Sequence, residues 1–341
     1  MMKIKDLKLK IVEKFKIFAS ISLAIILVGI VLMIVPGMNV GLDFAGGAKL
    51  DINFGAYLET HENIKDGLVQ EVNDTIKGEG FEIGSTRWSG EGASTMEIGL
   101  KYVLNDKPIK ANDAAKQKEF MDHVEALKEK IVTVVNAYDE GFNFTVENIV
   151  DTTVSGSTAQ KVLSNAIWAT VVAIIVMLIY IGFRFTLSSG LAAIIALTHD
   201  VLIMLALTTI FRIQVNTTFI AAIITIVGYS INATIVIFDR IREVAKLESS
   251  KELTDVEIAN KSIGDTLGRT ILTTITTLAV IVVLAIVCAI MGVSTMGEFA
   301  LPIIFGLIAG TYSSVFLSAS SWVYLRRLGA KIKIRAKKKA K

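Results

Sequence analysis

The chain has 341 residues, 52% of them hydrophobic, and a mean hydropathy of +0.59, which excludes an ordinary soluble domain. Its net charge of +3 is small, but the charge is unevenly spread. Six lysines lie in residues 1–16 and nine Lys or Arg in residues 326–341, whereas residues 36–160 carry eleven Lys or Arg against twenty-one Asp or Glu. Basic residues beside apolar runs indicate a membrane surface with anionic lipid head groups rather than a nucleic acid.

The first apolar run, residues 15–35, follows the amino-terminal lysines. A cleaved signal peptide is one alternative, but the run is longer than a typical cleavable core and no A-x-A-type site follows it. We therefore predict an uncleaved first transmembrane helix. Residues 4–15 place apolar side chains on one helical face, so they form either a surface-lying lead-in or a frayed basic tail.

Residues 36–161 predict a folded domain outside the membrane. The glycines of GLDFAGG at 41–47 indicate a bend at which the chain leaves the membrane and enters a sheet, rather than a phosphate-binding loop. The pattern then reads strand, helix, strand, strand, helix, strand. This order predicts a ferredoxin-like βαββαβ domain with two helices on one face of a four-stranded sheet. The expected elements are 46–54, 61–80, 81–90, 93–104, 113–141 and 142–154.

Five more apolar runs complete a predicted set of six spans. An even number places both basic ends on one side, and the positive-inside rule identifies that side as the cytoplasm. The fold class is therefore an α+β membrane protein with six transmembrane helices and one extracytoplasmic domain. Thr254 and Glu257 have capping-box spacing and predict a short helix along the inner surface. The further spans are 162–182, 187–210, 215–238, 270–292 and 298–323, with a cytoplasmic loop at 239–269, a five-helix bundle over 162–325 and a cytoplasmic tail at 326–341.

The third span carries His199 and Asp200 near the middle of the bilayer. An aspartate there costs about 2.5–3.5 kcal/mol on insertion scales, so it is expected to face the bundle interior and find a partner. Three interpretations are open for this pair. It is a structural hydrogen-bond lock, a charge beside a water-filled cavity, or a group that handles protons.

The fourth and fifth spans carry further polar groups. Tyr229 and Asn232 share one helical face, Thr234 follows them, and Arg269 begins the fifth span before a run of threonines. Asn232 forms either an interhelical bond or part of a functional site, and the threonines favour helix packing. The fourth span ends in a charged stretch that is either a solvated helix end or, through Asp239, a pairing point with another helix. That stretch contains Asp239, Arg240 and Arg242.

Motifs of soluble enzymes are missing from the sequence. It contains no GxxxxGK[ST], HExxH or GxSxG. Cys288 is the single cysteine, so no intrachain disulfide or cysteine-based metal site can form, and the three histidines are scattered. We predict that the chain is not an enzyme and holds no cofactor and no metal.

Several motifs together resemble the SecF branch of the SecD/SecF family. The resemblance covers nearly the whole chain, and VGYSINATIVIFDRIRE is its most specific part. The motifs are GLDFAGGAKL at 41–50, NAIWATVVAIIVMLIYIGFRF at 165–185, ALTHDV at 196–201, VGYSINATIVIFDRIRE at 227–243 and ANKSIGDTLGRT at 259–270.

The resemblance implies half of a resistance–nodulation–division bundle, completed by a SecD-like partner beside the SecYEG channel in the bacterial inner membrane. Its expected task is to promote the late export of polypeptides with the proton-motive force. The alternatives are half of a proton-driven small-molecule or lipid exporter, or a non-transporting scaffold of the translocon.

One family position departs from the pattern. The family pairs a proton-linked aspartate in the fourth span with an arginine that matches Arg269, but this chain has Ala233 where the family has an acid. Alanine cannot bind a proton. Either the partner supplies the carboxylate, or Asp200 does part of the work, or this half is mainly structural. We favour the first account.

Overall fold

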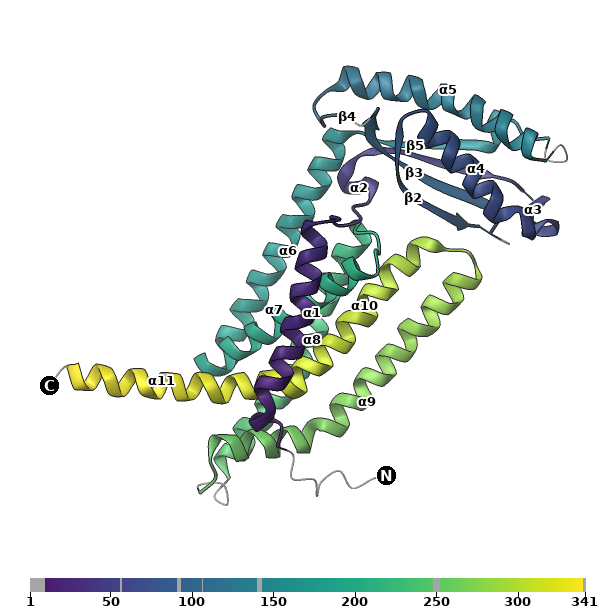
Figure 1. The fold of residues 1–341 in the computed structure, drawn as a ribbon. Helices are drawn as coiled ribbons and strands as arrows, with labels where there is room; N and C mark the ends of the chain where they lie inside the picture. Colours follow the sequence, from purple (N-terminus) through teal and green to yellow (C-terminus); the bar gives the residue numbers. More distant parts are fainter. Residues whose placement is uncertain are drawn as a thin grey trace.

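Long helices and a small sheet domain divide the molecule into two parts (Figure 1). The structure is a computed structural model that describes residues 10–55, 57–90, 93–105, 107–139, 143–247 and 252–339. The sheet domain lies at one end of the helical bundle, and both described chain ends lie at the opposite end of it.

The sheet domain has the predicted βαββαβ order. Its main strands are arranged β2-β3-β1-β5, all antiparallel, and α4 and α5 cover one face, which confirms the ferredoxin-like expectation. A two-residue strand, β4 (Lys107–Pro108), adds to β3 and was not predicted. The elements are β1 (Gly47–Asn53), α3 (Tyr57–Thr60), η3 (Glu62–Ile64), α4 (Lys65–Gly78), β2 (Phe81–Ser89), β3 (Thr95–Leu104), α5 (Ala114–Tyr138), η6 (Val146–Asn148) and β5 (Ile149–Val154).

An apolar core between the sheet and its two helices holds this domain together. Leu50 and Ile98 are cross-strand neighbours on β1 and β3, and both are fully buried beneath Phe120 of α5. The alternation of buried and exposed residues along β1 is the period-2 pattern of a sheet with one covered face. Asp113 caps α5 by accepting a hydrogen bond from the Lys116 amide at 3.1 Å.

The predicted glycine bend is present where the chain enters the sheet. A short helix, α2 (Leu42–Ala45), ends at Gly46, whose φ is +73°, and Gly47 follows with φ +144°. A Cβ atom on Gly47 would lie 2.0 Å from the carbonyl oxygen of Leu100. Only glycine therefore allows β1 to start this close to β3.

Six helical segments of the described residues are long and apolar enough to cross a membrane, as predicted. A short turn, η2 (Val12–Lys14), leads into α1. The last span continues from α10 through a π-helical segment, η8, into α11. The segments are α1 (Phe15–Ile34), α6 (Gly156–Arg184), α7 (Leu187–Ile210), α8 (Thr217–Lys246), α9 (Asp255–Ile290), α10 (Ser294–Tyr312), η8 (Ser313–Ser318) and α11 (Ala319–Lys339).

Most of the helices, but not α1 and α7, extend beyond the predicted span boundaries. Within the expected loop at 239–269, residues 239–246 continue α8 and residues 255–269 belong to α9, and the expected tail is helical through Lys339. The helix ends continue because they bury apolar residues against each other, including Ile241, Val244 and Ile263. The predicted capping box is confirmed, since the Thr254 amide donates to Glu257 Oε2 at 2.7 Å. The lead-in predicted for residues 4–15 lies largely outside the described residues.

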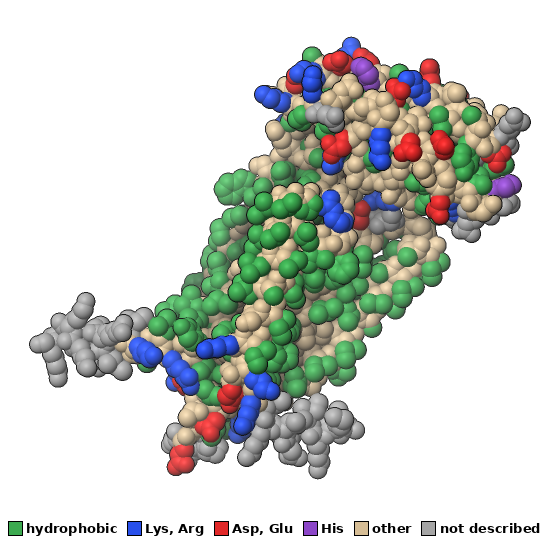
Figure 2. Space-filling view, viewed as in Figure 1, with side chains coloured by type: hydrophobic (Ala, Val, Ile, Leu, Met, Phe, Trp, Pro, Cys, Tyr) green, Lys and Arg blue, Asp and Glu red, His purple; other side chains and the backbone are tan. Residues whose placement is uncertain are grey.

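The bundle is apolar on its outside and carries polar groups on its inside. Figure 2 shows a band of hydrophobic side chains between the charged sheet domain and the charged groups at the opposite end. α7, α8 and the last span bury much of their surface, whereas α1, α6 and α9 leave most of theirs exposed. This distribution is that of a protein whose outer helices face lipid.

Candidate functional site

The polar residues predicted inside the spans form two clusters. The first, which we call the buried seam, comprises His199, Asp200, Ser230, Thr234 and Ser314. The second, which we call the open cleft, lies between α8 and α9. α8 contributes to both because residues two apart on a helix point about 200° apart, so Ser230 and Asn232 face opposite directions. The open cleft is lined by Tyr229, Asn232, Ala233, Val236, Arg269, Thr270, Thr273 and Thr274.

The buried seam is centred on Asp200, which is fully buried. Asp200 Oδ1 lies 2.9 Å from His199 Nδ1, and Asp200 Oδ2 accepts a hydrogen bond from the Ser230 hydroxyl. One turn further along α8, the Thr234 hydroxyl lies 3.3 Å from that of Ser314. Each of these polar atoms therefore has a partner within the chain, which is what a bilayer interior requires.

Small residues bring the last span close to this seam. Gly306 and Gly310 face α8, and a Cβ atom on Gly306 would lie 2.5 Å from Ile226 Cγ1. A Cβ atom on Gly310 would lie 3.5 Å from Asp200 Oδ2. The two glycines thus act as the small-xxx-small contact that the sequence indicated, and they allow α10 to cover the carboxylate.

The open cleft is less buried than the seam. It has a volume of about 90 Å³, and both Asn232 and Arg269 are exposed. Tyr229 donates from its hydroxyl to Thr274 Oγ1 at 3.2 Å, and Thr274 in turn lies 2.8 Å from Thr311 Oγ1. Within the described part of the chain, no carboxylate forms an ion pair with Arg269. The cleft therefore presents a free guanidinium beside Ala233.

The polar residues that the sequence singled out in the fourth and fifth spans are divided between the two clusters. Thr234 belongs to the buried seam, whereas Tyr229, Asn232 and Arg269 belong to the open cleft. No hydrogen bond or ion pair between described residues joins Asp200 to Arg269. The cause is helix geometry, because Asn232 and Thr234 are two residues apart on α8 and so point in nearly opposite directions.

The charged end of α8 pairs with two neighbouring helices. Arg184 of α6 donates to both carboxylate oxygens of Asp239, at 2.9 and 2.7 Å. Arg240 donates to Asp265 of α9 at 2.6 Å, and Arg242 lies 4.0 Å from Asp239. Of the two interpretations open for this stretch, pairing across helices is therefore the one that the structure shows. These charge-assisted hydrogen bonds connect α8 to α6 and α9.

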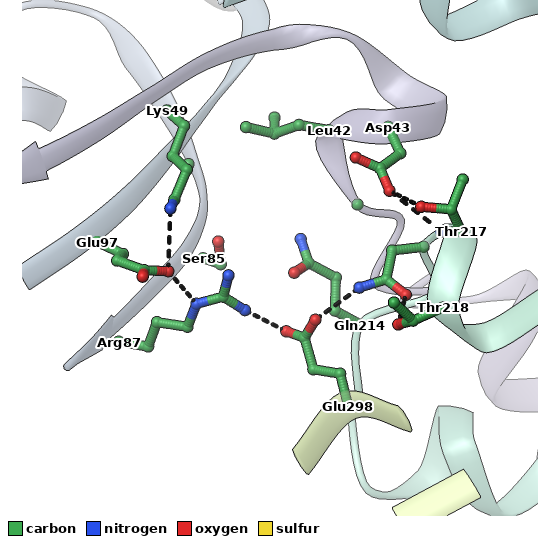
Figure 3. A pocket seen from close by; sticks show the side chains of 13 residues that line it. Leu42, Asp43, Lys49, Ser85, Arg87, Glu97, Gln214, Thr217, Thr218 and Glu298 are labelled. Atoms are coloured by element: carbon green, nitrogen blue, oxygen red, sulfur yellow. Dashed lines mark hydrogen bonds and ion pairs between the residues drawn. The ribbon is translucent and has the colours of Figure 1, made fainter. Parts of the chain in front are cut away.

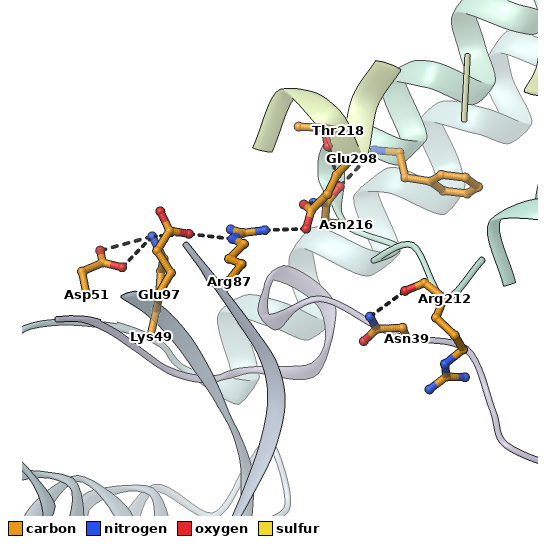
Figure 4. Close-up of polar contacts among 10 residues, drawn as sticks. Asn39, Lys49, Asp51, Arg87, Glu97, Arg212, Asn216, Thr218 and Glu298 are labelled. Atoms are coloured by element: carbon orange, nitrogen blue, oxygen red, sulfur yellow. Dashed lines mark hydrogen bonds and ion pairs between the residues drawn. The ribbon is translucent and has the colours of Figure 1, made fainter. Parts of the chain in front are cut away.

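A third polar cluster joins the sheet domain to the bundle, and sequence reasoning missed it. Arg87 of β2 donates to Glu298 at the start of α10, and Glu298 Oε2 accepts from Asn216 Nδ2 at 2.6 Å (Figure 4). On the sheet side Arg87 Nε also donates to Glu97 Oε2 at 2.6 Å, and Lys49 lies 3.3 Å from the same oxygen. We call this set, Lys49, Arg87, Glu97, Asn216 and Glu298, the junction network.

The junction network borders a cavity of about 180 Å³ (Figure 3). Asn216 also caps α8, since its Oδ1 accepts from the Phe219 amide at 3.1 Å. Asp43 of α2 accepts from the amide of Thr217 at 3.1 Å and from its hydroxyl. The start of α8 is thus held by residues of α2, and the starts of α8 and α10 are linked through Glu298 to the sheet.

The pKa of Glu97 shows how neighbouring groups of the junction network act on one of its carboxylates. Burial alone would raise the pKa of its carboxyl, but hydrogen bonds from Ser89 and Arg87 and the charges of Arg87 and Lys49 lower the pKa below its ordinary value. The surroundings of Glu97 therefore favour its ionised form. Its only sequence signal was an acid, Glu298, at the start of an apolar run. Nothing in the sequence indicated that Arg87, 211 residues earlier, would be its partner.

Comparison with known proteins gives a family. The family model of the protein export membrane protein SecD/SecF, C-terminal, matches residues 134–328. The chain belongs to the SecD/SecF family. It is 34% identical to the protein translocase subunit SecF of Petrotoga mobilis over 90% of this chain and 93% of that protein. It is 32% identical to the protein translocase subunit SecDF of Bacillus subtilis over 91% of this chain but 37% of that protein.

The fold of this SecD/SecF family member is also found in a solved structure. The crystal structure of SecDF from Thermus thermophilus, described as a translocon-associated membrane protein, matches with a TM-score of 0.70 and 27% identity. The match covers 96% of this chain and 40% of that one. The chain thus spans about two fifths of the fused SecDF proteins and nearly the full length of a separate SecF.

Proposed function

We propose that this chain is an accessory subunit of the Sec protein-export machinery that acts with a SecD-like partner. Its membership of the SecD/SecF family supports a role in protein export. The fused relatives support the partner, because a matching segment is covalently joined to a longer chain in SecDF. Exported polypeptides and the SecYEG channel are the further partners in this proposal.

The observation that carries the proposal is the free guanidinium of Arg269 beside Ala233. A charged side chain within the bundle that has no acidic partner among the described residues of its own chain is expected to find one on another subunit. The partner subunit's carboxylate fills this place, and it supplies the proton-binding group that Ala233 cannot provide. Protonation of that carboxylate removes its attraction to Arg269 and so changes how the two half-bundles pack.

The proton-motive force supplies the energy in this mechanism. One elementary charge that crosses a potential of 100 mV releases about 2.3 kcal/mol, which is sufficient to shift helix packing. The junction network then passes the shift of α8 and α10 to the sheet domain through Asn216, Glu298 and Arg87. This arrangement requires the sheet domain outside and both termini in the cytoplasm of a bacterial inner membrane.

The test is an export assay in cells that depend on this chain. Depletion slows the release of exported precursors, and Arg269→Ala reproduces that defect at normal protein levels. Lys246→Ala is the matched control, because it removes an exposed cation at the end of α8 away from the cleft. Normal export after clean deletion of the chain contradicts the proposal.

Ala233 favours one other function, that of a non-transporting scaffold of the translocon. A scaffold needs no proton-binding group in the cleft and no charge on Arg269. In that case both Ala233→Asp and Arg269→Ala leave the export rate and its dependence on the proton gradient unchanged. A dependence that is lost in Arg269→Ala and retained in Arg269→Lys excludes the scaffold.

A further inference from the structure

The buried His199–Asp200 pair contains one imidazole nitrogen that takes no part in the hydrogen bond between the two side chains. His199 is 9% exposed and Asp200 is fully buried, so both are cut off from water by the chain itself. His199 Nδ1 is engaged with Asp200 Oδ1 at 2.9 Å, but the buried Nε2 of His199 has no hydrogen-bond partner. Buried polar atoms are nearly always paired, so this nitrogen is an exception that calls for a function.

Among the described residues around Asp200, His199 is the group that can place a positive charge beside its carboxylate. Ser230 on α8 contributes a hydroxyl, and Gly310 on α10 contributes only backbone. Tyr312, whose ring stacks on His199 at 6.1 Å between centroids, is the titratable residue facing it from α10, and its hydroxyl donates to the Phe18 carbonyl of α1. Among the described residues, no Lys, Arg, Asp or Glu bonds to either member of the pair.

We propose that His199 and Asp200 form a proton-binding site that belongs to this chain alone and is separate from the open cleft. Nδ1–H donates to the Asp200 carboxylate, which leaves a lone pair on Nε2. One proton added to Nε2 turns the imidazole into imidazolium and changes the net charge of the pair from −1 to 0. Loss of the same proton from Nε2 restores the first state, and no other bond changes.

The helices around the pair supply a place where such a change can alter packing. The π-helical segment η8 begins directly after Tyr312, and its Ser313, Ser314 and Ser318 are buried. π-Helical turns inside long helices occur frequently at functional sites. The charge change lies beside Tyr312, directly before this turn, and the turn connects α10 to α11. The biological role of this site rests on the proposed function, but the protonation of the His199–Asp200 pair does not.

The test is nitrogen NMR of the full chain in lipid nanodiscs with ¹⁵N-labelled histidine. The chain has three histidines, and His61 and His123 lie in the sheet domain, so His199→Gln assigns the third signal. The proposal predicts a His199 signal that changes from neutral imidazole to imidazolium as the pH falls between about 8 and 5. In Asp200→Asn this change is lost over the same range, while the His61 and His123 signals report an intact domain.

A His199 signal that keeps one neutral tautomer over this whole pH range overturns the proposal and leaves a structural lock. Ser230→Ala is the second variant, because it removes a hydroxyl from Asp200 without touching the imidazole. If the His199–Asp200 pair itself binds the proton, the His199 signal still changes with pH in Ser230→Ala. The result is independent of export. A titrating His199 in a chain whose deletion leaves export normal refutes the proposed function and supports this site.

Discussion

The buried seam and the open cleft lie on opposite faces of α8. Their polar groups differ in burial and in the partners that they have among the described residues. In the seam, both oxygens of Asp200 are bonded within the chain and covered by α10. In the cleft, Asn232 and Arg269 are exposed, and Arg269 has no acidic partner among the described residues. The carboxylate of the seam is therefore satisfied within the chain, whereas in the proposed function the cleft is completed by another subunit. Polar groups of the seam should therefore stabilise the chain, and those of the cleft should affect only its work with a partner.

The largest expected effect separates the two regions by stability. Asp200→Ala leaves His199 and Ser230 buried without their partner, and we expect a loss of about 3–5 kcal/mol in the free energy of unfolding. Arg269→Ala removes an exposed side chain and is expected to change that free energy by less than about 0.5 kcal/mol. Denaturant unfolding of the isolated chain in detergent measures both. Equal losses in the two variants would abolish the distinction between seam and cleft.

The junction network should behave like the seam, because its members are paired within the chain. Glu298→Leu leaves Arg87 and Asn216 without an acceptor, and we expect a loss of about 1–3 kcal/mol. The variant should also loosen the sheet domain from the bundle, which hydrogen exchange of the β2 and α10 amides would detect. Glu252→Leu is the control, since Glu252 is exposed far from the junction. If hydrogen exchange of these amides is unchanged in Glu298→Leu, the junction network does not couple the bundle to the sheet domain.

The capping box at the start of α9 gives a smaller effect of the same kind. Thr254→Ala removes the hydroxyl that bonds the Glu257 amide, and we expect a loss of about 1 kcal/mol. Export should be unaffected at normal temperature, because the cap lies far from the cleft. Thermal unfolding compared with Thr254→Ser, which keeps the cap, measures the difference. A Thr254→Ser variant as unstable as Thr254→Ala would show that the hydroxyl is not the cause.

The smallest expected effect is a pH dependence of the junction network. The pKa of Glu97 is lower in the folded chain than its ordinary value of 4.5, so its stabilisation is fully present above pH 4.5 and is lost as the pH falls through the lowered pKa. Because the pair is partly exposed, we expect less than about 1 kcal/mol. Wild type should be more stable than Glu97→Gln at pH 7, and the gap should close below pH 4.5. A gap that stays constant with pH would contradict the ion pair.

The sequence predicted those features that arise from local periodicity. Span 187–210 coincides with α7, and the strand and helix order of the outer domain is as predicted, because alternation and apolar runs are properties of neighbouring residues. Span ends were less accurate, since Ile241 and Ile263 extend α8 and α9 by packing against each other beyond the apolar runs.

The sequence named the polar residues of the bundle but did not show which of them lie together. It named His199, Asp200, Asn232, Thr234 and Arg269 as one set of polar positions, and the structure divides them between the seam and the cleft. Their role in handling protons stays a prediction. Contacts between distant segments, such as Arg87 with Glu298, depend on how the sheet domain sits on the bundle. No local pattern encodes that placement.

Cysteine cross-linking in native membranes tests most directly whether the open cleft is completed by another subunit. In a Cys288→Ala background, Asn232→Cys places a thiol in the cleft, and Ile231→Cys places one on the adjacent buried face of α8. The account predicts that Asn232→Cys cross-links to a cysteine in an acidic span of the SecD-like partner and that Ile231→Cys does not. Cross-linking of Asn232→Cys only to lipid probes, or equal partner cross-linking from both positions, would contradict it.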